Sequence, residues 1–287
     1  MFTTLRLDTR PDAVAVLTFD QPDSRANVLT AQVWADFEAA LDVLADRTDL
    51  AGLVLASAKP GIFIAGADLK LLADAPGPHD PAVRAFIDHG LRTLDKLETL
   101  LFPTCAAIDG AALGGGLEVA LACDYRVVGA NPKVALGLPE VKLGLIPGWG
   151  GTQRLPRVLR VEPLTTTVEM LLTGNPLNAV EAVQCGLAEA AAPGQDVVEA
   201  AVAKVLPDAR WVEQRLRKRS ALPPSDFSPR TAFSPATVEG IRVLSEGIKL
   251  PLADAIKLET AAFMALAGSG ESKRLIAEFF AARRKPV

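Results

Sequence analysis

The sequence predicts an α/β core followed by a helical C-terminal region. In the first half of the chain, short apolar segments typical of buried strands alternate with longer segments whose apolar residues fall at helical spacing. After Val161 the strand-like segments almost disappear. With 287 residues, of which 49% are hydrophobic, the chain is long enough to bury a large core.

The first part of the core reads as strand, helix, strand and loop. Residues 14–19 are a compact β-rich run that stops at a turn cluster. Residues 30–46 carry apolar side chains at helical spacing, and Thr30 is placed to cap the first turn. Residues 52–57 form another apolar strand, and we expect residues 59–68 to form a loop after it.

The second part of the core repeats the alternation of strands and helices. Residues 81–101 have the spacing of an amphipathic helix and end before a proline. Residues 104–109 read as a buried strand that leads through a glycine cluster into an apolar helix over residues 117–123. Residues 124–128 then form a further strand.

The rest of the chain is predicted to be mostly helical. Helices are expected over residues 162–172, 179–184, 197–206 and 210–220. The Pro/Ser-rich residues 222–235 read as a linker or wrapping loop before a final helical region over residues 238–284.

Composition and charge narrow the class of partner. The net charge of -4 arises from 30 basic and 34 acidic residues scattered along the chain, without the basic stripe that would follow a phosphate backbone. We therefore expect no nucleic-acid partner. No apolar run approaches the roughly 20 residues needed to cross a bilayer, and the start lacks the features of a signal peptide. We therefore expect no membrane association and a cytoplasmic location, and we interpret the basic residues 283–285 as a solvated tail.

The cysteines and histidines show no metal-binding pattern. Cys105, Cys123 and Cys185 are widely spaced among small apolar residues, so we interpret them as core residues in a reducing compartment. His79 and His89 flank a Pro/Asp-rich stretch without further Cys or His at metal-ligand spacing. We therefore predict no metal site.

The most informative segment joins a strand to a helix through three glycines, Gly114 to Gly116. Backbone without Cβ atoms can approach a ligand closely, and the N–H groups at a helix N-terminus favour negative charge. The Walker and GxGxxG patterns of phosphate-binding loops are not matched. A tight structural turn is the alternative interpretation of the glycines alone.

Two glutamates follow glycine-rich or proline-led helix starts. Glu118 lies in the first turn of the helix among apolar residues, where burial would raise its pKa and suit it to proton transfer. Glu140 follows a proline and precedes the glycine-dense residues 143–152, which are richer in glycine than a connection requires. Acids are also common in first turns for purely electrostatic reasons, so neither residue alone defines a site.

Three segments in order resemble the signature segments of the crotonase (enoyl-CoA hydratase/isomerase) family. They are residues 65–70, 109–118 and 138–154, and their spacing also matches, apart from a two-residue lengthening near Asn131 and Pro132 that we interpret as part of a hairpin. The similarity covers roughly residues 10–195.

The resemblance implies a spiral of ββα units that binds thioesters of coenzyme A. The acyl carbonyl would sit in an oxyanion hole formed by the backbone amides of Ala67 and Gly115, each such donor lowering a barrier by roughly 3 kcal/mol. Further substrate contacts are implied at Ala65, Asp68, Leu69, Lys70, Gly114 and Gly148. No separate cofactor is expected, because coenzyme A enters as part of the substrate.

The reaction implied by the resemblance is reversible addition of water to a trans-2-enoyl-CoA, giving a 3-hydroxyacyl-CoA. Hydratases of the family keep both acids, and we expect Glu118 to help deprotonate the water while Glu140 protonates Cα. The alternatives are a Δ3,Δ2-enoyl-CoA isomerase, which uses the same oxyanion hole, and a non-catalytic binding homologue. Product analysis with a 3-enoyl substrate would distinguish the isomerase from the hydratase. A hydration assay would distinguish the non-catalytic homologue from the hydratase.

The resemblance also suggests a division of the chain. Residues 1–195 would form the spiral core with the active site, and residues 196–287 a helical region for oligomerisation and for covering the acyl pocket. The family implies a homotrimer or hexamer. The C-terminal helices also resemble the hydratase half of bifunctional fatty-acid oxidation enzymes, although no dinucleotide-binding pattern follows before Val287.

Overall fold

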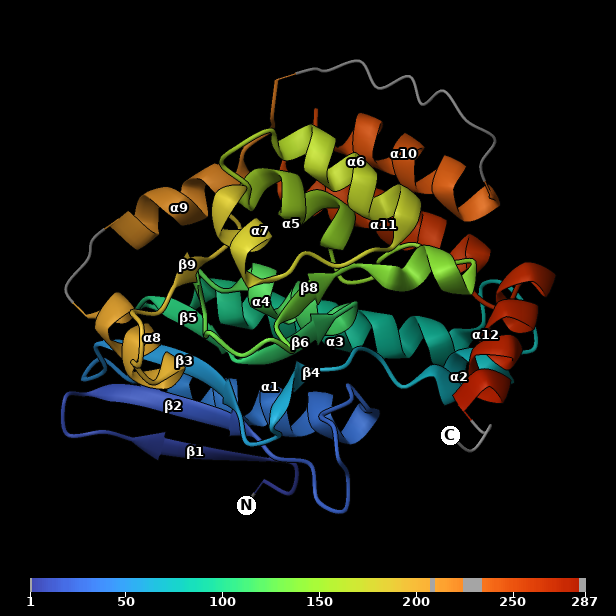
Figure 1. Cartoon of the computed structure of the whole chain (residues 1–287). Coiled ribbons are helices and arrows are strands. Elements are labelled where there is room, and N and C mark those ends of the chain that lie inside the picture. The colour runs from blue at the N-terminus through green and yellow to red at the C-terminus, as the bar shows by residue number, and fades with distance from the viewer. Residues whose placement is uncertain (1, 207–209, 224–233, 284–287) are drawn as a thin grey trace.

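The computed structural model describes residues 2–206, 210–223 and 234–283, which contain a six-stranded and a three-stranded β-sheet (Figure 1). The larger sheet has the order β1 (Leu5–Thr9), β2 (Val14–Phe19), β3 (Gly52–Ser57), β5 (Thr104–Ile108), β7 (Tyr125–Val128) and β9 (Glu189–Ala190). Strand β1 is antiparallel to β2, and the other neighbours are parallel. The smaller sheet has the parallel strands β4 (Gly61–Ile64), β6 (Gly110–Leu113) and β8 (Ala135–Gly137).

The helices surround these sheets and dominate the second half of the chain. The first seven are α1 (Ala31–Ala45), α2 (Leu69–Asp74), α3 (Pro81–Thr99), α4 (Gly115–Ala122), α5 (Gly151–Val158), α6 (Pro163–Thr173) and α7 (Ala179–Gln184), with the 3₁₀ helix η1 (Pro139–Leu143) before α5. The C-terminal helices are α8 (Val197–Val205), α9 (Arg210–Arg219), α10 (Pro235–Gly247), α11 (Leu252–Leu266) and α12 (Gly270–Arg283). The predicted α/β core with a helical C-terminal region is confirmed.

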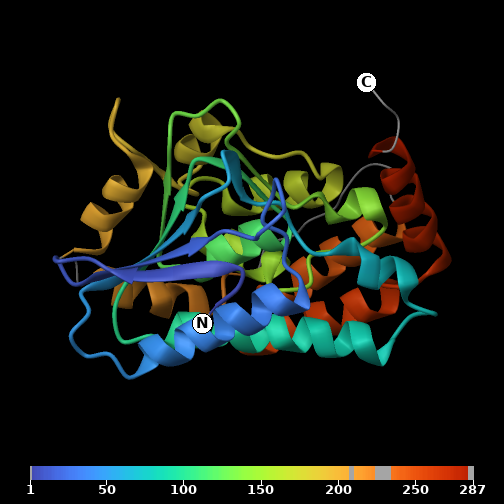
Figure 2. The same cartoon turned by 90° about the horizontal axis from the view of Figure 1, so that it is seen from below.

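The central strands are apolar because the larger sheet is covered on both faces. Every residue of β5 is buried, as expected for a parallel strand with two covered faces. On one face Val54 and Cys105 pack with Val202 and Val205 of α8, and on the other Leu55 belongs to the main hydrophobic core. Seen from below, α1 and α3 lie side by side against this core (Figure 2).

Most helix predictions from the sequence are confirmed within a residue or two. Thr30 caps α1 by accepting a hydrogen bond from the N–H of Val33. Helices α6 to α9 follow the predicted ranges closely, and α10, α11 and α12 occupy the final helical region. Most of the predicted linker, residues 222–235, lies outside the described residues, as do residues 284–287 of the predicted basic tail.

Two predictions about the connections are wrong. Part of the expected loop over residues 59–68 is strand β4, and residues 110–113 of the glycine cluster form β6. These strands begin at glycines that lie against each other, because a Cβ on Gly110 would be 2.0 Å from the carbonyl carbon of Gly61. Glycine is a poor strand former, so the sequence pattern does not reveal them.

The lengthened segment near Asn131 is not part of a hairpin. It connects β7 in the larger sheet with β8 in the smaller sheet, so the chain crosses between sheets at this point. Helix α5 was also missed, because its start at Gly150 and Gly151 and its internal Pro156 are typical of a loop.

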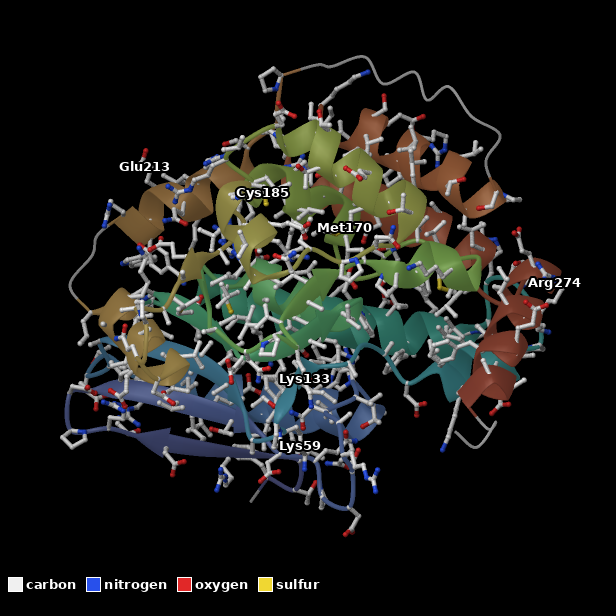
Figure 3. The ribbon with its side chains drawn as sticks, in the orientation of Figure 1. Lys59, Lys133, Met170, Cys185, Glu213 and Arg274 are labelled. Carbon is white, nitrogen blue, oxygen red and sulfur yellow. The ribbon has the colours of Figure 1, made fainter. Side chains whose placement is uncertain are left out.

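Most apolar side chains are buried, and most charged side chains lie at the surface. Met170 lies between helices, Cys185 is half-buried, and Glu213 and Arg274 extend from the surface (Figure 3). Cys105 and Cys123 are buried and unbridged, as the prediction of core cysteines requires. In the described ranges, no helix is both long and apolar enough for a transmembrane span.

Candidate active site

A cavity of about 250 Å³ lies where the three signature segments meet. The segment after β4, the start of α4 and the segment from η1 to Trp149 supply most of its wall. Phe86 and Ile87 of α3 add an apolar side, and Phe263 of α11 and Phe279 of α12 complete it. The C-terminal helices therefore contribute directly to the cavity.

Most of the site residues expected from the sequence line this cavity. They are Ala65, Ala67, Leu69, Gly114, Gly115, Glu118, Glu140 and Gly148. Asp68 and Lys70 lie outside the lining. Asp68 caps α2 by accepting a hydrogen bond from the N–H of Lys70 at 3.1 Å, and the Lys70 side chain is exposed.

The backbone N–H groups of Ala67 and Gly115 find no partner in the sheets and helices of the described residues. Leu29 pairs with the strand around Ala67 by donating to the Gly66 carbonyl at 2.8 Å and accepting from the Asp68 N–H at 3.0 Å. This parallel pattern turns the Ala67 N–H to the opposite side of the strand. Gly115 is the first residue of α4, so its N–H has no acceptor within the helix.

Gly114 brings the start of α4 against Glu140. Its φ of 54° and ψ of -125° suit only glycine, and a Cβ there would be 2.6 Å from Oε1 of Glu140. The glycine cluster therefore lets a carboxyl group approach the backbone at the entrance to α4. Glycine is therefore required at this position by the close approach of the Glu140 carboxyl group as well as by the backbone conformation of the turn.

Glu118 is held at the bottom of the cavity by main-chain donors. It is 1% exposed, and its Oε1 accepts hydrogen bonds from the N–H groups of Trp149 at 2.7 Å and Gly151 at 2.8 Å. Burial raises its pKa well above the usual value, and repulsion from Glu259 and Glu140 adds to the shift. The two amide donors oppose the shift by stabilising the charged form.

Glu140 lies on η1 with one oxygen facing no donor. Its Oε2 atom is buried and has no hydrogen-bond partner among the described residues. Burial raises the pKa of this carboxyl to about 8. A buried polar atom without a partner is rare in folded proteins and marks a place where a water or ligand atom can bind.

A third buried carboxyl group, that of Glu259 on α11, supports the same loop. Its Oε1 accepts from the Gly150 N–H at 2.5 Å, and its Oε2 accepts from the N–H and the hydroxyl of Thr152 at 2.8 and 2.5 Å. The N–H groups of residues 149–152 thus alternate between Glu118 and Glu259. Burial raises the pKa of Glu259 to about 7.

Sequence reasoning missed Glu259, although a signal was present. It lies on the buried face of α11, four residues from Ala255 and from Phe263, where an apolar residue would be expected. An acid on the apolar stripe of a helix indicates a buried partner, which here is the N-terminus of α5.

Trp149 and Arg154 fix the loop from its other side. The Trp149 indole donates to the Ile87 carbonyl at 3.1 Å, and its ring packs against the Trp34 ring with centroids 5.0 Å apart. Arg154 donates to the Trp149 carbonyl at 2.6 Å and pairs with buried Glu98 at 2.7 Å. Arg154 and Lys218 lower the pKa of Glu98 to about 2 against the effect of burial.

The comparisons with known proteins agree with this architecture. Residues 9–218 match the model of a family described as enoyl-CoA hydratase/isomerase. The DspI structure from Pseudomonas aeruginosa is 30% identical, covers 74% of this chain and 84% of its own, and gives a TM-score of 0.63. An enoyl-CoA hydratase from Bacillus anthracis is 28% identical over 99% of this chain and 98% of its own, with a TM-score of 0.65. EchA1_1 from Mycobacterium paratuberculosis is 28% identical over the same shares, with a TM-score of 0.70.

The six-stranded and the three-stranded sheet, with a cavity at the N-terminus of α4, give the chain the crotonase fold. The chain belongs to the enoyl-CoA hydratase/isomerase, or crotonase, family. The family expected from the three sequence segments is therefore confirmed, and the family acts on acyl-CoA thioesters.

Proposed function

We propose that the protein is an enoyl-CoA hydratase, which adds water reversibly to a trans-2-enoyl-CoA to give a 3-hydroxyacyl-CoA. The observation that carries the proposal is the pairing of Glu118 and Glu140 at one cavity, with Oε2 of Glu140 buried and unpartnered. Two acids allow one group to remove a proton while the other supplies one. A single acid would suffice to move a proton in an isomerase.

In this proposal the amides of Ala67 and Gly115 bind the thioester carbonyl oxygen. Attack of water at Cβ moves the π electrons through Cα towards that oxygen, and fixed N–H donors stabilise the resulting enolate. The unpaired state of both amides in the regular structure supports this role.

Glu118 is assigned as the base and Glu140 as the acid. Burial raises the pKa of both acids, and that of Glu118 well above its usual value, so the two carboxyl groups compete for a proton. We place the ionised form on Glu118 because two amide N–H groups donate to its Oε1, whereas Oε2 of Glu140 has no donor among the described residues and favours the neutral form. Glu118 takes a proton from water as the Cβ–O bond forms. Glu140 gives its proton to Cα as the enolate collapses, so the overall proton count is conserved.

The first test is hydration of crotonyl-CoA, followed by the loss of enoyl absorbance. We expect turnover in the unmodified protein and a fall in kcat of about 10²–10⁴-fold in Glu140→Gln, because the proton donor is removed while the shape is kept. The matched control is Glu169→Gln at an exposed position on α6, which should leave kcat unchanged.

Two results would contradict the assignment. Unchanged turnover in Glu140→Gln would remove Glu140 from the reaction. Conversion of a 3-enoyl-CoA to the 2-enoyl isomer, without any hydration of crotonyl-CoA, would favour the isomerase instead.

A further inference from the structure

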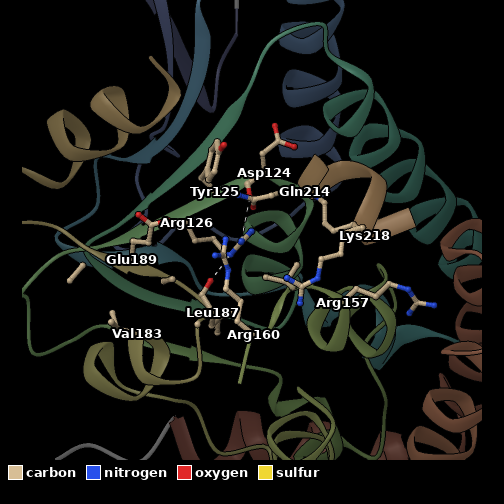
Figure 4. Close-up of a pocket in the computed structure, with 15 residues that line it drawn as sticks. Asp124, Tyr125, Arg126, Arg157, Arg160, Val183, Leu187, Glu189, Gln214 and Lys218 are labelled. Carbon is tan, nitrogen blue, oxygen red and sulfur yellow. Dashed lines mark hydrogen bonds between the residues drawn. The ribbon is translucent and has the colours of Figure 1, made fainter. Parts of the chain in front are cut away.

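A second cavity, of about 360 Å³, lies between β7, the segment around β9, the end of α5 and helix α9 (Figure 4). It shares no lining residue with the candidate active site. Its wall is rich in cations, which include Arg126, Arg160, Arg217 and Lys218. Arg157 also lines it, but its guanidinium extends away from the centre (Figure 4) and donates to the carbonyls of Gly247 and Leu250.

The acids of this wall are paired with cations from outside the cavity. Asp124 pairs with Arg215 at 2.6 Å, and Glu189 pairs with Lys204 at 2.7 Å. Neither Arg215 nor Lys204 lines the cavity. Glu189 is therefore balanced by Lys204, whereas Asp124 is shared between Arg215 and the neighbouring charges of Arg126 and Lys218. The two carboxylates thus balance only part of the charge of the four cations.

Arg126 is a buried guanidinium bonded to carbonyl oxygens. It is 7% exposed and donates to the carbonyls of Leu187 at 2.7 Å and Cys123 at 3.1 Å, and more weakly to those of Ala120 and Asp124. Burial lowers the pKa of Arg126, and the charge of Arg160 lowers it further, so the two guanidinium groups repel each other. Like charges at a cavity without a free carboxylate are stabilised by a bound anion.

Helix ends explain part of this arrangement but leave an excess of positive charge. Arg126 and Lys218 donate to carbonyls at the C-terminus of α4, and Arg217 donates to the Leu159 carbonyl after α5. Each helix C-terminus supplies only about half a negative charge. Lys218 also pairs with Glu98 at 3.1 Å. The remaining cations, Arg126, Arg160 and Arg217, carry three positive charges, whereas the two helix ends together supply about one negative charge.

We propose that this cavity binds a small anion with at least two negative charges on phosphate or carboxylate oxygens. Guanidinium groups bind such oxygens through paired, charge-assisted hydrogen bonds. Arg126 supplies positive charge at the buried end of the site, where four carbonyls already accept from its guanidinium. The exposed Arg160 and Arg217 form the rim and would supply the hydrogen bonds to the anion. This cavity is separate from the candidate active site, so the proposal does not depend on the proposed hydratase function.

The experiment is a titration of the full chain with pyrophosphate and with citrate at constant ionic strength, by calorimetry and by thermal unfolding. Pyrophosphate and citrate distinguish the phosphate from the carboxylate source, and acetate is the singly charged comparison. We expect saturable binding of one multivalent anion per chain with a rise in Tm, and no saturable binding of acetate.

The variant for this test is Arg160→Gln with Arg217→Gln, since both side chains are exposed and their loss does not disturb the core. The affinity for the anion should fall at least about tenfold, the effect of losing one charge-assisted contact. Arg160→Gln alone should give part of this loss. Arg6→Gln, an exposed arginine on β1, is the matched control and should leave the affinity unchanged.

Three outcomes would overturn the proposal. One is the absence of saturable binding, and another is equal affinity in the double variant. The third is loss of binding in Lys70→Gln, which would place the anion at the exposed surface of α2 and away from this cavity. The first outcome can be divided further by measuring the oligomeric state. If the unmodified chain binds no anion and the double variant changes the oligomeric state, the cavity would be assigned to contacts between copies of the chain.

Discussion

Glu140 is a buried acid whose pKa makes folding depend on pH. Its Oε2 is buried without a partner, and its pKa of about 8 lies well above the value of about 4.5 for an unfolded chain. The folded protein therefore holds a proton that the unfolded chain has released between these pH values. The contribution of Glu140 to folding stability is therefore fully present below pH 4.5 and is lost as the pH rises towards 8.

The pH dependence gives a prediction for Glu140→Gln. The glutamine cannot ionise, so the variant should gain stability relative to the unmodified protein as the pH rises from 5 to 9, by roughly 2 kcal/mol. This is less than the full shift in pKa implies, because the Glu140 residue as a whole is only half-buried and solvent screens its charge. Urea unfolding at both pH values measures the difference, and Glu169→Gln serves as the exposed control. Parallel pH profiles for the two proteins would contradict the environment assigned to Glu140.

At this scale the sequence indicates residues that line the candidate site but not how they are held. Glu118 and Glu140 are predictable because each follows a recognisable helix start within a signature segment. Glu259 is not, because its partner Gly150 lies 109 residues away and the contact depends on how α11 docks. The unpartnered oxygen of Glu140 likewise depends on two segments meeting in space.

At the scale of elements, the N-terminus of α5 is fixed by acids from two directions. Glu118 from α4 and Glu259 from α11 take alternate N–H groups of the loop. The positive end of the α5 dipole favours charge on both. The loop therefore holds the base of the proposed reaction and is itself held by the C-terminal region.

Replacing Glu259 by alanine should show how much this contact contributes. The change leaves two N–H groups and one hydroxyl buried without an acceptor, and each costs about 1–3 kcal/mol. We expect a loss of about 3–5 kcal/mol in the free energy of unfolding, measured in urea.

The control for Glu259→Ala lies on the same helix. Asp254 is exposed and pairs with Lys257 at 2.9 Å, so Asp254→Ala should cost less than about 1 kcal/mol. Equal effects of the two substitutions would mean that the contacts of Glu259 do not stabilise the loop.

The elements that the sequence failed to predict share a physical cause. Strands β4 and β6 begin with glycines whose backbones lie in contact with each other. Helix α5 begins with glycines whose N–H groups donate to the carboxyl groups of Glu118 and Glu259. In each case tertiary contact overrides local propensity. Long apolar elements such as β5 and α1 were predictable because burial alone determines their pattern.

At the scale of the whole molecule, the cavity is closed by parts distant in sequence. Helix α3 supplies Phe86 and Ile87, and α11 supplies Phe263, whose ring atom Cδ2 would be 3.0 Å from a Cβ on Gly148. The size of the cavity is therefore set jointly by the core and by the C-terminal helices.

Phe263→Ala should widen the substrate range if the protein hydrates enoyl-CoA. The lost ring leaves room for a longer or branched acyl chain, so the ratio of kcat/KM for an eight-carbon over a four-carbon enoyl-CoA should rise about tenfold or more. Leu101→Ala, at an exposed apolar position, is the control. An unchanged ratio would show that Phe263 does not face the acyl chain.

Glu259 and Phe263 lie one turn apart on the same face of α11, where Glu259 accepts from the loop that also donates to the proposed base and Phe263 lines the cavity. Exchanging this helix between relatives, as in a chimera designed for a new acyl chain, would replace both at once. The proton affinity of the acids would change together with the room for the substrate. Substrate range and pH optimum should therefore be inherited as a single trait, and recombination of C-terminal segments would not separate them.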